Sequence, residues 1–193
     1  ALLLRQAKRG SEADAIEAEL GASRSAQEAY LASLAAETST LAAVAVNRRY
    51  YSLVLQAFAA VRERGPIRGV LVEGHEPLEL LVRSGNVGSA AARGWHLLNS
   101  VHFVDLLRLV GGEVASVAVA ADPRRLPNRS VSASLRFESG VVGTYLAHWN
   151  SASPPSMKIY GDDVTAEVEL GQPEAGFVRY NGKRRIKLHP DAS

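Results

Sequence analysis

Alternating strand patterns fill the second half of the chain and constrain its fold more than any other feature. Segments with alternating apolar and polar residues, or with many β-branched residues, lie at 114–121, 130–137, 141–149, 157–160, 165–170, 177–180 and 183–188. Glu138-Ser139-Gly140 joins two of them by a tight turn, and Asn181-Gly182 supplies the positive φ angles of a two-residue hairpin. Successive hairpins predict a largely antiparallel sheet.

An amphipathic helix is expected before these strands, from Gly94 to Gly112. Its apolar residues recur three and four positions apart and form a stripe that faces a core: Leu97, Leu98, Val101, Val104, Leu106 and Leu109. A second amphipathic helix is expected from Tyr51 to Arg64, followed by a strand from Ile67 to Glu73 that Leu78 to Val82 extends. We therefore expect an α+β fold, with helices on one face of an open sheet.

The first part of the chain has a different pattern, helix and then buried strand. Ser23 is a suitable cap for a helix from about Ala26 to Glu37. The continuous apolar run from Thr40 to Val46 is typical of a strand that is buried on both faces of a parallel sheet. Together these two segments predict one half of an α/β crossover.

The composition restricts the class of protein. Apolar residues make up 47% and charged residues 22% of the 193 residues, as in ordinary globular proteins. The net charge of +2 is small and the basic residues are scattered, which argues against nucleic-acid binding; the run from Lys183 to Lys187 is interpreted as the solvent face of a strand. With no cysteine and no long apolar segment, we expect a cytoplasmic protein without a membrane partner.

Three polar residues on the expected helix form a candidate site. Asn99, His102 and Asp105 are three positions apart, so their side chains share one face of the helix. A carboxylate beside an imidazole fixes its tautomer and raises its basicity, which suits acid/base chemistry. The alternative is that His102 and Asp105 only satisfy each other at a half-buried helix edge.

A third possibility is a metal site built from His96, His102 and Asp105. His96 and His102 are six positions apart and lie on different faces of a helix, so they do not converge as a His-x-x-x-His pair does. We predict no metal here.

Several motifs resemble one family of oxidoreductases. Val44 to Tyr50 resembles a strand end and Asn-Arg-Arg-Phe/Tyr turn, Gly94 to Gly111 resembles a helix with the pattern Asp-x-Gly-x-His-x-x-Asp-Leu-Leu, and Ile159-Tyr160-Gly161 resembles a late strand and turn. These features, in this order, are similar to the Gfo/Idh/MocA family, named for glucose-fructose oxidoreductase and inositol dehydrogenase.

The resemblance implies a two-domain oxidoreductase. Residues 1–46 would be a truncated remnant of a Rossmann-like nucleotide domain, and residues 47–193 an α/β domain for substrate binding and oligomerisation. The implied cofactor is NAD or NADP, and the implied substrates are sugars, cyclitols and related polyols. The open face of the sheet would pair with a second copy in a homo-oligomer.

Transfer of the family's catalytic residues is incomplete. His102 matches the acid/base histidine, with Asp105 as an orienting residue, but Ala18 stands where the family has a lysine and Leu98 where it has an aspartate. A Gly-x-Gly-x-x-Gly loop is also missing, because the chain begins after the point where that loop would lie. Cofactor binding by this chain alone is therefore doubtful, and the choice between NAD and NADP cannot be read.

Two functions follow from these observations. The first is the substrate-binding portion of an NAD(P)-dependent oxidoreductase, inactive or weakly active alone, with His102 as acid/base and a pocket lined by Arg48, Arg49, Trp95, His96 and Asn99. The alternative is a non-catalytic sugar-binding or dimerisation module of the same descent. Cofactor binding separates the two.

Overall fold

The computed structural model describes residues 29–30, 32–40, 45–86, 88, 92, 99–121, 130–171, 175–181 and 185–190. The chain divides into two units, residues 1–45 and 46–193, and each is described by itself.

In the first unit, the described residues 29–30 and 32–38 are helical, and Ser39 has a left-handed backbone with φ 52°. This agrees with the helix predicted up to Glu37. Thr40 and Ala45, together with Val46 at the start of the second unit, lie in no strand, which departs from the prediction for 40–46 at its ends. The middle of that segment lies outside the described residues.

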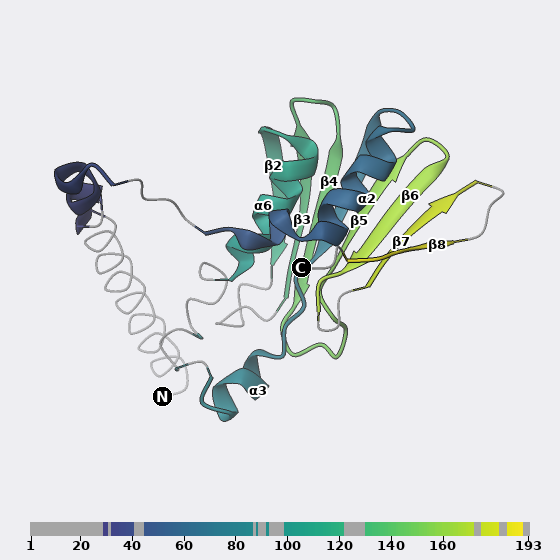
Figure 1. Cartoon of the computed structure of the whole chain (residues 1–193). Helices are drawn as coiled ribbons and strands as arrows, with labels where there is room; N and C mark the ends of the chain where they lie inside the picture. The colour runs from purple at the N-terminus through teal and green to yellow at the C-terminus, as the bar shows by residue number, and fades with distance from the viewer. Residues whose placement is uncertain are drawn as a thin grey trace. The chain divides into compact units, whose positions relative to one another are not determined.

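The second unit is built on one eight-stranded sheet with the order β2-β3-β4-β1-β5-β6-β7-β8 (Figure 1). The strands are β1 (Ile67–Glu73), β2 (Val114–Ala121), β3 (Ser130–Phe137), β4 (Val142–His148), β5 (Ser156–Gly161), β6 (Val164–Glu169), β7 (Ala175–Tyr180) and β8 (Ile186–Leu188). Only β1 and β4 pair in parallel; all other neighbours are antiparallel. The largely antiparallel open sheet predicted from the sequence is confirmed.

Helices cover one face of this sheet (Figure 1). The helical elements described are η1 (Asn47–Tyr50), α2 (Ser52–Arg62), α3 (Leu78–Arg83) and α6 (Ser100–Gly111). Helix α2 packs on β5, β6 and β7, and helix α6 packs on β1 and β4. Gly112 ends α6 with a φ of 85°, a backbone conformation that glycine adopts without strain.

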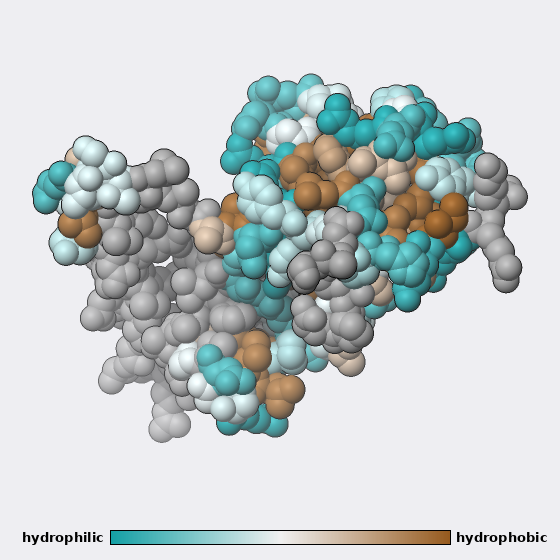
Figure 2. All heavy atoms as spheres, viewed as in Figure 1, coloured by the Kyte–Doolittle hydropathy of each residue, from teal (hydrophilic) through white to brown (hydrophobic). Residues whose placement is uncertain are grey.

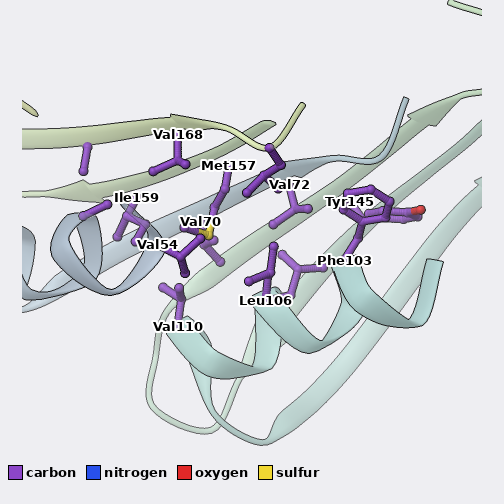
Figure 3. Close-up of a cluster of buried hydrophobic side chains, with 14 of the residues drawn as sticks. Val54, Val70, Val72, Phe103, Leu106, Val110, Tyr145, Met157, Ile159 and Val168 are labelled. Carbon is purple, nitrogen blue, oxygen red and sulfur yellow. The ribbon is translucent and has the colours of Figure 1, made fainter. Parts of the chain in front are cut away.

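The core lies between the helices and the sheet. Figure 3 shows Val70, Val72 and Met157 of the strands facing Val54 of α2 and Leu106 of α6. These side chains are at most 2% exposed. Burial of this apolar surface is the main favourable contribution to folding. In α6 the buried face is formed by Phe103, Leu106, Leu107 and Val110, and the predicted stripe is wrong at Val101 and Val104, which are 37% and 42% exposed. The face that packs on β1 and β4 is therefore rotated from the one predicted.

The opposite face of the sheet carries no helix in the described part of the second unit. A shallow depression on it is lined by residues that include Gly69, Leu71, Val142, Thr144 and Tyr160. Val142 is 57% exposed and Tyr160 is 37% exposed. This face therefore presents both apolar and small side chains to solvent.

The helical face of the second unit is different. Hydrophilic residues surround scattered hydrophobic ones in Figure 2, and the exposed apolar residues there include Leu55 of α2 and Val104 of α6. None of the helices in the described part of the chain is long and apolar enough to cross a membrane.

One predicted element is wrong. Leu78 to Val82 was expected to extend a strand but forms the helix α3. Its apolar residues Leu78, Leu81 and Val82 have the spacing of one helical face, Glu79 lies in the first turn and Arg83 in the last. Both charges favour the helix through its dipole. Period-two alternation cannot be separated from helical spacing over so few residues.

Candidate substrate site

The candidate site lies where η1, the end of β1 and the start of α6 meet. Element η1 packs against α6 and α2, and α6 packs against β1. The loop Gly74 to Pro77 follows β1 directly, and its backbone is tied to β4, because the Gly74 amide donates to the Leu146 carbonyl at 2.8 Å. The fold therefore brings residues near 48, 76, 102 and 145 together.

Arg48 of η1 is held by two contacts. Its guanidinium lies 4.0 Å from the centroid of the Phe103 ring, and its Nη2 is 3.8 Å from Oε1 of Glu76. Stacking on an aromatic ring fixes the plane of a guanidinium. The Nη1 atom of Arg48 is buried and has no hydrogen-bond partner within the described residues.

Arg49, the next residue, contacts a different side chain. Its Nε lies 3.1 Å from Oδ2 of Asp105. The predicted arrangement had Asp105 orient His102. Here the Asp105 carboxylate faces Arg49. Nδ1 of His102 is buried and forms no hydrogen bond within the part of the chain described. Asp105 acts on His102 only through its charge.

The surroundings of His102 favour its uncharged form. Burial and the positive charge of Arg48 lower the pKa of His102 below its usual 6.5, and the charge of Asp105 opposes them only in part. A neutral imidazole at physiological pH can accept a proton, as a general base must. The charge balance around His102 thus comes from η1 as well as from its own helix.

Tyr145 of β4 also belongs to this cluster. Its ring is buried beside Phe103 (Figure 3). Burial raises the pKa of Tyr145, and its hydroxyl has no hydrogen-bond partner within the described residues. Gly74 makes room for it, because a Cβ at Gly74 would lie 2.8 Å from the Tyr145 hydroxyl and 3.0 Å from Cδ2 of Phe103.

A second polar network lies at the adjacent ends of β1, β4 and β5. The backbone amide of His148 donates to Nδ1 of His75 at 3.1 Å, and the two imidazoles stack with centroids 5.6 Å apart. Nε2 of His75 is 3.6 Å from Oε1 of Glu73, whose other oxygen accepts a hydrogen bond from Ser156. This network anchors the loop that carries Glu76.

Buried polar atoms without partners gather at the first cluster. Within the described residues, six side-chain atoms of this cluster are buried and lack hydrogen bonds: Nη1 of Arg48, Nε of Arg49, Nδ2 of Asn99, Nδ1 of His102, Oδ2 of Asp105 and the Tyr145 hydroxyl. Asn99 is also the residue that precedes α6, yet its side chain does not cap the helix. Buried unpaired polar groups are rare in native proteins, and a concentration of them points to a ligand or ordered water.

The sequence-predicted site residues divide into two groups. Arg48, Arg49, Asn99, His102 and Asp105 lie in or beside this cluster. Trp95 and His96 lie outside the described residues, so the pocket wall they were expected to form is not placed. Among described residues, no group of three histidine, cysteine or acidic side chains could hold a metal ion.

Glu76, Tyr145 and Ser100 were not singled out from the sequence. Each comes from a different segment, and no spacing relates residue 76 to residue 145. The weak signals were the buried-strand position of Tyr145 and the polar pair His75-Glu76 directly after a strand. Polar residues after a strand end are more often functional than polar residues elsewhere in a loop.

The described residues do not fit a nicotinamide dinucleotide. Such a cofactor binds where a glycine-rich turn leads from a strand into a helix. Helix α6 starts instead at Asn99-Ser100, and α2 follows the Asn-Arg-Arg-Tyr turn. We assign no cofactor contact to these residues.

Comparison with known proteins finds a family similarity within the second unit. The family model for the GFO/IDH/MocA C-terminal domain matches residues 81–167. This range includes α6 and the strands β2 to β5. No curated protein matches the chain by sequence.

Solved structures share the fold. A proposed NADPH-dependent oxidoreductase from Desulfitobacterium hafniense has a TM-score of 0.68 at 16% identity over 83% of this chain and 53% of that one. An inositol dehydrogenase homologue from Azotobacter vinelandii, in complex with NADH and myo-inositol, has a TM-score of 0.65 at 16% identity over 83% and 45%.

A UDP-N-acetylglucosamine 3-dehydrogenase from Acidithiobacillus ferrooxidans has a TM-score of 0.61 at 17% identity over 85% of this chain and 51% of that one. The chain thus spans about half the length of these structures. The matched segment, the open sheet and the resemblance predicted from the sequence agree: residues 81–167 are similar to the GFO/IDH/MocA C-terminal domain, and the chain shares the fold of these solved oxidoreductases.

Proposed function

We propose that this chain is the substrate-binding and oligomerisation portion of an NAD(P)-dependent oxidoreductase that acts on sugars, cyclitols or related polyols. Alone, it is inactive or weakly active. His102 is the acid/base residue, and Arg48, Arg49 and Asn99 bind substrate, together with Trp95 and His96. The enzyme is cytoplasmic.

One observation carries this proposal: the unpaired buried atoms of Arg48, Asn99 and His102 lie around one end of α6. A hydroxylated substrate offers hydrogen bonds to such atoms. Each bond contributes more free energy at a buried atom than at a solvated one, because the buried atom otherwise has no partner. The neutral state favoured for His102 suits removal of a hydroxyl proton during hydride transfer. The similarity of residues 81–167 to the GFO/IDH/MocA C-terminal domain supports the reaction class, and the inositol dehydrogenase homologue was solved with a polyol bound.

The open face of the sheet is the proposed contact with a second copy. Exposed Val142 and Tyr160 lie beside Gly69 and Thr144, so a flat surface with apolar side chains is available. Large exposed apolar surfaces commonly mark protein interfaces. A two-fold arrangement would place this face against itself.

A non-catalytic module is the second candidate. It is favoured by Ala18 and Leu98, which stand where the family has a catalytic lysine and aspartate. Loss of members of a catalytic group usually costs several powers of ten in rate. Under this alternative, the chain binds a sugar or dimerises without hydride transfer.

The test is equilibrium binding of NAD(H), NADP(H) and a panel of polyols to the purified chain by calorimetry. We expect polyol binding that His102→Ala and Arg48→Gln weaken by tenfold or more, and weak or absent cofactor binding. Arg83→Gln is the control that leaves binding unchanged, because Arg83 of α3 is largely exposed and, among the described residues, forms an ion pair with Glu79 of its own helix.

Polyol binding that persists unchanged in both site variants would contradict the proposed site. Cofactor binding in the micromolar range, with hydride transfer, would show that a nucleotide site is rebuilt from this chain. Polyol binding without any turnover, even with a complementing nucleotide-binding polypeptide, would favour the non-catalytic module.

A further inference from the structure

We infer that the site takes a sugar or polyol that bears a carboxylate, such as a hexuronate, and that Arg48 recognises that carboxylate. This inference rests on the proposed function and narrows its substrate class.

The first argument is the kind of atom left unpaired. Nη1 of Arg48 and Nδ2 of Asn99 can only donate hydrogen bonds, and Nδ1 of His102 donates in one of its tautomers. Nε of Arg49 is a third unpaired atom that only donates, although it lies 3.1 Å from Oδ2 of Asp105. That Oδ2 only accepts and also lacks a hydrogen bond, and the unpaired Tyr145 hydroxyl can donate or accept. A hydroxyl both donates and accepts, whereas a carboxylate only accepts. Because donor-only atoms outnumber the acceptor-only atom of Asp105 in this cluster, an acceptor-only group complements the donors better than a hydroxyl does.

The second argument is the incomplete pairing of Arg48. Glu76 approaches only Nη2, at 3.8 Å, which is longer than the roughly 2.7–2.9 Å of a strong charge-assisted hydrogen bond. Arg68 of β1 shows a two-point carboxylate pairing for comparison: its Nε donates to one oxygen of Asp162 at 3.0 Å, and its Nη2 donates to the other at 2.8 Å. Arg68 is exposed, while Arg48 is mostly buried. The buried guanidinium is thus the one with an unused edge.

The third argument is preorganisation. The Phe103 ring at 4.0 Å holds the plane of the Arg48 guanidinium, and Glu76 holds one edge, so little side-chain freedom is lost when a ligand binds the other. Arg49 with Asp105, and Arg48 with Glu76, balance in charge. A carboxylate would share Arg48 with Glu76.

The test compares sugars that differ at one group. D-Galacturonate and D-galactose differ only in the carboxylate or hydroxymethyl group at C6, and D-glucuronate and D-glucose form a second pair. Calorimetry on the full 193-residue chain measures each Kd. We expect the better uronate to bind at least tenfold more tightly than its neutral partner. Arg48→Gln should remove this preference, Arg48→Lys should keep part of it, and Arg83→Gln should keep all of it.

The outcomes are separable. Equal or tighter binding of the neutral sugars overturns the carboxylate inference and leaves the proposed function intact. Absence of binding for every sugar overturns both. Tighter binding of D-galactose 6-phosphate than of D-galacturonate would assign Arg48 to a phosphate and overturn the inference. Should Arg48→Gln fail to fold by circular dichroism, the comparison of uronate with neutral sugar on the unmodified chain still decides.

Discussion

At the scale of the residue, His102 shows how neighbours from another element set a protonation state. Burial lowers its pKa first, the Arg48 charge lowers it further, and Asp105 acts in the opposite direction. Asp105 was expected to be the dominant partner because it shares the helix. It is instead engaged by Arg49, whose Nε is 3.1 Å away.

We predict that the His102 imidazole titrates below pH 6.5 in the folded chain, and that Arg48→Gln moves its pKa upward. Between the folded pKa and the unfolded value near 6.5, the unfolded chain binds more protons. This contribution to stability is therefore fully present above about pH 6.5 and is lost as the pH falls. NMR titration of the imidazole resonances measures it, and an unshifted or raised pKa would contradict the prediction.

Gly74 is a second position where one residue decides local packing. A Cβ there would lie 2.8 Å from the Tyr145 hydroxyl and 3.0 Å from Phe103. We predict that Gly74→Ala destabilises the chain by about 1–3 kcal/mol, because both rings must move in a packed core. Gly88→Ala is the control, since nothing lies within 4 Å of its added Cβ. Thermal unfolding compares the two, and equal midpoints would refute the crowding.

At the scale of the element, α2 packs on the sheet through one face only. Leu53 is fully buried and Leu55, two positions on, is 44% exposed. Leu53→Ala should cost about 2–5 kcal/mol and leave a cavity between α2 and the sheet. Leu55→Ala should change the free energy of unfolding by less than about 1 kcal/mol. Denaturant unfolding measures both, and similar losses would mean that the helix packs differently.

The strands show which local patterns are reliable. β1, β2 and β3 have the predicted bounds, because alternation over seven or eight residues excludes a helix. The turn at Gly140, with φ 86°, gives the predicted hairpin between β3 and β4. Helix α3 was missed because six residues are too few to separate the two periods.

At the scale of the whole molecule, the open sheet face is the surface to test. We predict that the chain dimerises through it, and that Val142→Arg yields a monomer because charge is placed in the centre of the contact. Val104→Arg, at an exposed valine on the helical face, should leave the dimer intact. Size-exclusion chromatography with light scattering reports both masses, and a monomeric unmodified chain at high concentration would rule out the contact.

The sequence by itself determined the elements that depend on local periodicity: the amphipathic helices α2 and α6, the strands from β1 to β8, and hence an α+β fold with helices on one face. It also marked His102 and the arginines of η1, because the motifs around them are contiguous. Only the tertiary structure decided that Arg48 stacks on Phe103, that Glu76 reaches Arg48, that Tyr145 lies beside Phe103, and that Asp105 pairs with Arg49. These contacts join segments far apart in the chain, and such contacts follow from strand order and packing, which local periodicity does not encode.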